Sequence, residues 1–275
     1  MTEMLRRSRS KGGGQEANAA VWAALSGTTV GDAWLRRDEP KSAELVARYQ
    51  EAVAQLARGV PFAYAVRRAG FRTLDLLIDS RALIPRPETE GLVDLVLRHA
   101  GSGGLAADIG TGSGCIALAL ATEGRFERII AVERSAQAVA LARENVARVR
   151  PPTPVEIREG DLLAPLAGAR YRVIVANPPY LSDAEYDALD PSVKSFEPRE
   201  ALVSGQGGLD ATGALLAGAA ALLESGGFLA LEIDERRGDA VRGLAHAHGW
   251  TRIDVHEDIF GRPRFAVAYP TPMEG

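Results

Sequence analysis

Short apolar runs alternate with helix-length segments from residue 105 onward, and this pattern constrains the fold more than any other feature of the sequence. Such alternation is typical of a parallel sheet whose strands are joined by helices. The last two runs are separated only by residues 259–263, too few for a crossover helix, so these two strands should pair antiparallel. The sequence therefore predicts a doubly wound α/β domain. Its predicted strands are Leu105–Ile109, Arg128–Glu133, Val155–Arg158, Tyr171–Ala176, Phe228–Ile233, Thr251–Asp258 and Arg264–Tyr269.

The part of the chain before this domain has a different organisation. Residues 1–17 are basic and rich in glycine, and they predict a flexible tail. Residues 18–70 carry apolar side chains at helical spacing and predict a small helical domain. Residues 71–84 contain β-branched and apolar residues that predict a short hairpin, which would link the helical domain to a larger domain over residues 85–275.

Helix boundaries within the larger domain can also be predicted. Glu88-Thr89-Glu90 should open a helix, because acidic residues suit the positive helix start. Ser135 should cap a helix that runs to Val149. Residues 211–224 should form a helix that stops at Gly226-Gly227. The charged run Glu235-Arg236-Arg237 is interpreted as a solvated face.

Composition excludes several classes of function. The chain has 32 Lys and Arg against 36 Asp and Glu, a net charge of −4, so it lacks the positive field that duplex DNA binding needs. No apolar stretch approaches the roughly 20 residues that span a bilayer. The single cysteine cannot form an internal disulfide, and the four histidines lack the spacing of metal ligands. We therefore expect a cytoplasmic protein with no metal and no membrane partner, and the charge disfavours a nucleic acid as its partner. We also expect a monomer.

An aspartate and three alternating glycines follow the first predicted strand, as Asp108-Ile109-Gly110-Thr111-Gly112-Ser113-Gly114. Glycines let a ligand approach the backbone, so this loop predicts a small-molecule site, although a plain tight turn is the alternative. Glu133 ends the next strand, where a carboxylate can accept hydrogen bonds from both hydroxyls of a ribose. Asp161 and Leu162 follow the third strand and could meet a base ring, while a capped turn is the simpler interpretation.

A second motif, Asn177-Pro178-Pro179-Tyr180, stands at the end of a strand that should be fully buried. Ligands of open α/β sheets bind at that edge. The two prolines stiffen the loop, so that the side-chain oxygen of Asn177 and the backbone oxygen of Pro178 could accept both hydrogens of one planar amino group. Tyr180 could then stack on the flat face of that group. The motif predicts an NH2 nitrogen as the target, and a simple turn is the alternative.

Together the two motifs resemble those of S-adenosylmethionine-dependent methyltransferases that act on amino nitrogens. A narrower resemblance lies in Leu83-Ile84-Pro85-Arg86-Pro87-Glu88-Thr89-Glu90, which is similar to the signature that precedes the catalytic domain of the protein N5-glutamine methyltransferases of peptide chain release factors. The resemblance covers roughly residues 59–269. Further similar stretches are Phe196–Leu202, Gly207–Leu209, Leu231–Ile233 and Asp258–Arg264. Glu133 stands where these enzymes often have Asp, and residues 18–70 are short and only weakly similar.

The resemblance implies a class I methyltransferase fold, Rossmann-like, with a seven-stranded sheet whose last strand is antiparallel and with an N-terminal helical domain that recognises the substrate. It implies S-adenosyl-L-methionine as the cofactor and S-adenosyl-L-homocysteine as its product. The implied cofactor-binding residues are Asp108, Gly110, Thr111, Gly112, Gly114, Glu133, Asp161, Leu162 and Asn177, with Thr89 and Glu90 closing over the cofactor. The implied catalytic and substrate-binding residues are Asn177, Pro178, Pro179 and Tyr180.

The implied reaction is methylation of the side-chain amide nitrogen of the glutamine in the Gly-Gly-Gln motif of class I peptide chain release factors. Three alternatives stay open at this point. The substrate could be a glutamine of a ribosomal protein or an amino nitrogen of nucleic acid. The protein could also be a module that binds the cofactor without catalysing a reaction.

Overall fold

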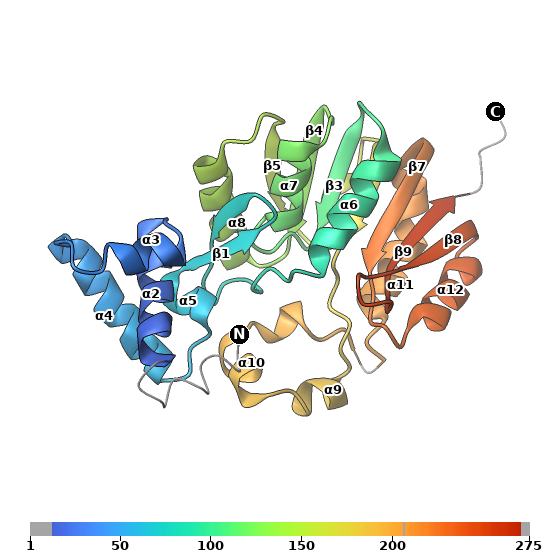
Figure 1. Ribbon diagram of the computed structural model, residues 1–275. Helices are drawn as coiled ribbons and strands as arrows, with labels where there is room; N and C mark the ends of the chain where they lie inside the picture. Colours follow the sequence, from blue (N-terminus) through green and yellow to red (C-terminus); the bar gives the residue numbers. More distant parts are fainter. Residues whose placement is uncertain (1–12, 206, 271–275) are drawn as a thin grey trace. The chain divides into compact units, whose positions relative to one another are not determined.

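The computed structural model describes residues 13–205 and 207–270, without the side chains of residues 13–17 and 192. The chain divides into two compact units, the first ending at Arg68 and the second beginning at Ala69 (Figure 1). Most of the predicted tail, residues 1–12, lies outside the described residues. The first described helix begins at Gly13, inside the segment predicted as a tail.

The first unit is helical. Tyr49 of its longest helix stacks on Trp22 with ring centroids 4.1 Å apart, and Val21, Leu25 and Ala52 belong to its small apolar core. Ser42 caps this longest helix by accepting a hydrogen bond from the Leu45 backbone N–H. The helices are α2 (Gly13–Ser26), α3 (Val30–Leu35), α4 (Ala43–Ala57) and α5 (Phe62–Val66).

A two-stranded hairpin follows, with β1 (Arg68–Phe71) paired to β2 (Leu74–Leu77). It begins earlier than the predicted range of 71–84. The backbone explains the difference, because Arg67 takes a left-handed conformation with φ 57° that ends α5, and Arg72, with φ 54°, makes the turn of the hairpin. The hairpin therefore starts directly at the end of the helical unit.

The second unit contains a seven-stranded sheet in the order β5-β4-β3-β6-β7-β9-β8. The first five strands of this order are parallel, and β9 is antiparallel to both of its neighbours. This topology confirms the predicted doubly wound fold and its antiparallel final strand. The strands are β3 (Leu105–Ile109), β4 (Arg128–Glu133), β5 (Val155–Glu159), β6 (Tyr171–Ala176), β7 (Leu223–Glu232), β8 (Trp250–Glu257) and β9 (Pro263–Pro270).

Helices cover both faces of the sheet (Figure 1). Side chains of a strand alternate between faces, so Val173 and Val175 of β6 join the core under α6 and α7, whereas Ile174 and Ala176 join the core under α11 and α12. Ser135 caps α8 as predicted, by accepting a hydrogen bond from the Ala138 N–H. The longer helices are α6 (Thr89–Ala100), α7 (Cys115–Glu123), α8 (Ala136–Val149), α11 (Asp210–Ala219) and α12 (Gly238–Ala247). Short helices are η2 (Ala164–Leu166), α9 (Asp183–Asp187), α10 (Pro191–Phe196), η3 (Arg199–Ala201) and η4 (Ala220–Leu222).

The prediction that Gly226-Gly227 stops a helix is wrong. The helix α11 ends at Ala219, η4 follows, and β7 already begins at Leu223. A Cβ atom on Gly227 would lie 2.8 Å from the carbonyl oxygen of Tyr171 on the neighbouring strand. Glycine at this position therefore allows two strands to approach closely, and it does not end a helix.

Candidate active site

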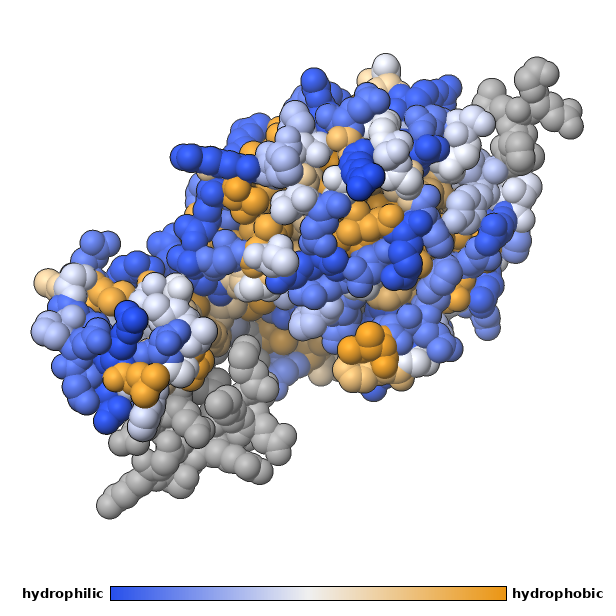
Figure 2. Space-filling model, turned by 45° about the horizontal axis from the view of Figure 1, so that its top comes forward, coloured by the Kyte–Doolittle hydropathy of each residue, from blue (hydrophilic) through white to orange (hydrophobic). Residues whose placement is uncertain are grey.

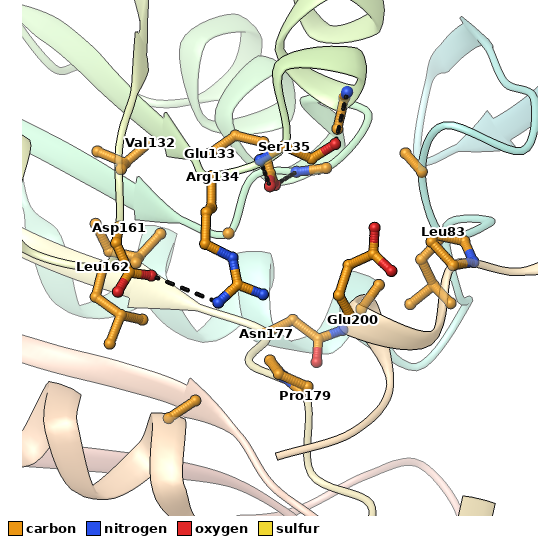
Figure 3. Close-up of a pocket in the computed structure, with 18 of the residues that line it drawn as sticks. Leu83, Val132, Glu133, Arg134, Ser135, Asp161, Leu162, Asn177, Pro179 and Glu200 are labelled. Atoms are coloured by element: carbon orange, nitrogen blue, oxygen red, sulfur yellow. Dashed lines mark hydrogen bonds and ion pairs between the residues drawn. The ribbon is translucent and has the colours of Figure 1, made fainter. Parts of the chain in front are cut away.

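A cavity of about 370 Å³ lies at the carboxyl ends of β3, β4, β5 and β6 (Figure 3). The strand order reverses between β3 and β6, and ligands of doubly wound sheets bind at such a reversal. The volume falls within the range of roughly 300–1,000 Å³ that small-molecule sites occupy. Seven of the predicted site residues line the cavity, namely Gly110, Gly112, Glu133, Asp161, Leu162, Asn177 and Pro179.

The glycine-rich loop forms one wall of the cavity. Gly110 lines it with φ 70°, and a Cβ atom built on Gly110 would meet no other atom within 4 Å. A side chain there would therefore occupy open space at the cavity wall, in a backbone conformation that favours glycine. Gly114 has a different role, because a Cβ on it would contact Leu118 and Ala142 of the adjacent helices at 3.5 and 3.7 Å.

Asp108 lies behind this loop and does not line the cavity. Its Oδ2 accepts hydrogen bonds from the Thr111 hydroxyl at 2.6 Å and from the Ala117 backbone N–H at 3.0 Å. Thr111 is also buried and donates this bond, so the pair braces the loop against the start of α7. Burial raises the pKa of the Asp108 carboxyl to about 7.

This raised pKa predicts how the stability of the Asp108→Asn variant should depend on pH. The folded protein binds a proton at Asp108 more tightly than the unfolded chain does. Protonation of Asp108 therefore adds to the free energy of unfolding at low pH, and this added stability is lost as the pH rises from about 4 to about 7. Asparagine does not titrate. The free energy of unfolding of the variant minus that of the wild type should therefore rise by up to about 4 kcal/mol across this window. Urea denaturation at several pH values measures this difference, and a constant difference would contradict the burial effect.

Glu133 ends β4 and points its carboxylate along the cavity wall (Figure 3). Its Oε2 accepts a hydrogen bond from the Gly112 N–H at 3.0 Å, and its Oε1 accepts one from the Ser135 N–H at 2.9 Å. These two bonds fix the position of the carboxylate. Each oxygen keeps a further lone pair, so the group can still accept two hydroxyl hydrogen bonds.

Asp161 and Leu162 line the cavity beyond Glu133, where β5 ends. Leu162 has φ 45°, a left-handed conformation that costs a residue with a Cβ about 1–2 kcal/mol. Such strain is concentrated at functional sites. Arg134, which the sequence did not indicate, extends its guanidinium over the cavity to within 4.0 Å of the Asp161 carboxylate (Figure 3).

Asn177 and Pro179 line the cavity at the end of β6. The side-chain nitrogen of Asn177 donates a hydrogen bond to the Thr89 hydroxyl oxygen at 3.1 Å, and that hydroxyl donates to Oε2 of Glu232 at 2.7 Å. Pro178, between Asn177 and Pro179 in the chain, is buried and is not among the residues that line the cavity. Burial raises the pKa of Tyr180 to about 12, so its hydroxyl stays neutral at physiological pH.

The structure does not bring every predicted residue to the cavity, since Thr111, Gly114 and Tyr180 do not line it. Thr89 is 2% exposed and is bonded to Asn177 and Glu232 instead of lining the wall. Glu90 points elsewhere, because its carboxylate accepts a hydrogen bond from the Arg72 backbone N–H at 2.7 Å. The predicted pair therefore separates into a residue beside the Asn-Pro-Pro-Tyr motif and a residue that holds the hairpin turn.

Ion pairs that the sequence did not indicate hold the segment between β6 and α11. Arg86 and the buried Glu197 form an ion pair at 2.6 Å, which ties the segment before α6 to the residues that follow α10. Arg237 is 13% exposed and contacts Glu185 at 2.5 Å, so the interpretation of its charged run as a solvated face is wrong at this position. No local sequence pattern predicted these two ion pairs, because the two residues of each pair are far apart in the chain.

Gly208 also contributes to this segment. A Cβ atom on Gly208 would come within 2.4 Å of the Tyr180 carbonyl oxygen, so only glycine allows the segment to pack against the end of the Asn-Pro-Pro-Tyr motif. The similar stretch Gly207–Leu209 in the sequence pointed to this position without giving its physical reason.

Within residues 13–205 and 207–270, no group of three or more His, Cys, Asp or Glu side chains is arranged to hold a metal ion. Over the same residues every helix is too short or too polar to cross a bilayer. On the face drawn in Figure 2, apolar residues lie in small groups separated by hydrophilic ones.

Comparisons with known proteins agree with this geometry. The family model of the methyltransferase small domain matches residues 89–193. The chain is 42% identical over 240 residues to a release factor glutamine methyltransferase of Xylella fastidiosa (strain 9a5c), covering 86% of each chain. It is 40% identical over 237 residues to a protein of the same name from Moorella thermoacetica, covering 85% of this chain and 83% of the relative.

A solved structure supports the fold independently. The crystal structure of a methyltransferase from Pyrococcus furiosus matches with a TM-score of 0.55 at 18% identity, and it covers 82% of this chain and 98% of the other. Identity at this level shows the fold alone, whereas the relatives above share most of their length at higher identity. The chain therefore belongs to the release factor glutamine methyltransferases.

Proposed function

We propose that this protein transfers a methyl group from S-adenosyl-L-methionine to the side-chain amide nitrogen of the glutamine in the Gly-Gly-Gln motif of class I peptide chain release factors. The observation that carries the proposal is the placement of Asn177 and Pro179 in the same cavity as Gly110 and Glu133. Residues of the motif predicted to bind an amide and of the motif predicted to bind a nucleoside thus line one cavity. The relatives' name supplies the substrate class.

The residues of the cavity fit the cofactor. Open space beside Gly110 suits the close approach of a methionine chain to the backbone. The fixed carboxylate of Glu133 suits the two hydroxyls of a ribose, as derived above. Leu162 offers an apolar surface, and Asp161 an acceptor, for an adenine ring. When bound, S-adenosylmethionine supplies an electrophilic methyl group.

The chain's own residues then orient the acceptor. The nitrogen of a glutamine amide is a poor nucleophile because its lone pair is delocalised into the carbonyl group. We infer that the side-chain oxygen of Asn177 and the backbone oxygen of Pro178 accept its two hydrogens, which stabilises positive charge as it develops on the nitrogen. Tyr180 confines the planar amide with a ring that stays neutral. Orientation and fixed dipoles supply most of the catalysis.

We also propose that the protein acts in the cytoplasm, since translation termination takes place there. We propose that it acts as a monomer. The helical unit that ends at Arg68 is proposed to recognise the release factor, and the unit that begins at Ala69 to carry out the reaction. This assignment follows the predicted division into a recognition domain and a methyltransferase domain.

The test uses methyl-labelled S-adenosylmethionine and four acceptors. These are a class I release factor, the same factor with the Gly-Gly-Gln glutamine replaced by alanine, a ribosomal-protein fraction and total RNA. We expect label in the intact release factor alone. Label confined to ribosomal protein or RNA would keep the chemistry and overturn the proposed substrate. Binding of the cofactor without labelling of any acceptor would instead favour a module that only binds the cofactor.

A further inference from the structure

Two buried residues outside the cavity are bonded in series to Asn177. Thr89 and Glu232 are each 2% exposed, and they come from α6 and from the last residue of β7. The three side chains form one chain of hydrogen bonds, in which the Thr89 hydroxyl lies 2.7 Å from Glu232 Oε2 and 3.1 Å from Asn177 Nδ2. None of the roles proposed for the cavity residues explains why the Glu232 carboxylate is buried at the end of this series of hydrogen bonds.

The number of available protons decides the direction of each hydrogen bond. An ionised carboxylate can only accept, so the single proton of the Thr89 hydroxyl must be donated to Glu232. The Thr89 oxygen can then only accept from Asn177, which means that the amide nitrogen, and not the oxygen, faces Thr89. The opposite orientation would place two oxygens against each other with no proton between them.

The orientation of this amide matters for the reaction proposed above. With its nitrogen held by Thr89, Asn177 presents its oxygen elsewhere, and Figure 3 shows that oxygen on the side of Pro179. An acceptor at this position can bind an N–H of the substrate amide. If the amide were turned round, it would present N–H groups to an NH2 group, and no hydrogen bond could form.

We propose that Thr89 and Glu232 are positioning residues that fix the amide of Asn177 with its oxygen toward the substrate nitrogen. This role rests on the proposed function for its chemical purpose, but the orientation itself is a property of the protein without substrate. Neither side chain touches the reacting atoms. Their effect on methyl transfer passes through Asn177 alone.

Protonation of Glu232 should release this constraint. A protonated carboxyl can donate to the Thr89 oxygen, which frees the Thr89 proton for the Asn177 oxygen and allows the amide to turn. Burial raises the pKa of Glu232 to about 7, so this change falls in an accessible range. The charged groups that act on it are Arg86 and Arg264, which favour the ionised form, and Glu88, which opposes it.

The first test observes Asn177 directly and needs no substrate. The chain has three asparagines, Asn18, Asn145 and Asn177, so selective labelling of asparagine with the nitrogen-15 isotope gives three pairs of side-chain NH2 signals in a proton–nitrogen NMR spectrum. The Asn177 signal, assigned by its loss in Asn177→Ala, should shift between pH 6 and pH 8. It should also shift in Thr89→Val, which keeps the size of the side chain and removes the hydroxyl.

Two controls make this spectrum decisive. Thr153→Val removes another buried hydroxyl, bonded to the Phe126 carbonyl, and should leave the Asn177 signal unmoved. Thr89→Ser keeps the hydroxyl and should restore the wild-type position of the signal. An Asn177 signal that stays the same in Thr89→Val and across the pH range would overturn the proposal, whatever the substrate of the enzyme proves to be.

The second test measures methyl transfer to the acceptor that the first labelling experiment identifies. Thr89→Val should lower kcat, but by less than the ~100-fold that losing the preorganised group itself costs, with the Kd of the cofactor changed less than about threefold. On the Asn177→Ala background the same substitution should lower kcat by less than about twofold, because residues that act as a unit are not additive. Equal losses on both backgrounds would show that Thr89 acts independently of Asn177 and would overturn the proposal.

The pH dependence of kcat distinguishes a positioning role of Glu232 from a purely structural one. Wild-type kcat should fall on acidification through the pKa of Glu232. Glu232→Gln, whose amide can donate to Thr89 as a protonated carboxyl does, should give low kcat and should lose the part of the acid limb that titration of Glu232 causes. An unchanged acid limb in this variant would contradict the role of Glu232.

Discussion

Replacing Asn177 by Ala should lower the rate of methyl transfer by at least ~100-fold, the scale of losing one preorganised group that stabilises developing charge. The side chain lies at the end of β6 and lines the cavity, and it is the acceptor that we propose for one hydrogen of the substrate amide. Because Gly110 and Glu133 remain, the Kd of S-adenosylmethionine should change by less than about threefold. Single-turnover kinetics with labelled cofactor and calorimetric titration measure the two quantities separately.

Two further observations make this result interpretable. Thermal unfolding of Asn177→Ala should resemble that of the wild type, because the side chain is only partly buried. Asn177→Asp keeps an oxygen toward the substrate but places a second acceptor against Thr89, so its rate should also fall. If Asn177→Ala kept near-normal turnover with an acceptor that the wild type methylates, the catalytic assignment would be wrong.

The central strands could be predicted to the residue because both of their faces are buried. The ranges Leu105–Ile109, Arg128–Glu133 and Tyr171–Ala176 appear in the structure as predicted. Most positions inside such a strand are apolar, with Asp108 and Arg172 as the exceptions here, so charged residues or glycine near the ends mark its limits. β7 departs from this pattern because its first half contains Gly226-Gly227, which local rules assign to the end of a helix.

The cavity wall could be predicted for a related reason. Once the strands are known to be parallel, residues at or directly after their carboxyl ends must meet at one edge, and Gly110, Glu133 and Asn177 are such residues. The support behind the wall could not be predicted. Thr89 and Glu232 are 143 positions apart, and no local pattern indicates that one of them bonds to the other. Contacts of this kind depend on how α6 packs against β7, which the sequence does not encode locally.

Replacing Glu133 by Ala should weaken the binding of S-adenosylmethionine by at least ~100-fold, while kcat at saturating cofactor should change much less. The carboxylate is held by the N–H groups of Gly112 and Ser135, so it is already oriented when the cofactor arrives. Two hydrogen bonds from ribose hydroxyls to a charged group contribute roughly 1.5–3 kcal/mol each, which together exceeds the ~2.7 kcal/mol of a 100-fold change in affinity. Calorimetric titration of the cofactor measures the loss.

The matched control for this variant is Glu159→Ala. Glu159 is an exposed glutamate at the end of β5, directly opposite Glu133 in the strand register, but it does not line the cavity. Its removal changes the net charge by the same amount at the same edge of the sheet, and the Kd of the cofactor should change by less than about twofold, as for other screened surface charges. If both variants lost the same affinity for the cofactor, a general electrostatic effect would explain the loss in Glu133→Ala. The assignment of Glu133 to the ribose would then fail. If only Glu133→Ala loses affinity while its free energy of unfolding stays within about 1 kcal/mol of the wild type, the lost interaction is with the cofactor rather than with the loop that Glu133 braces.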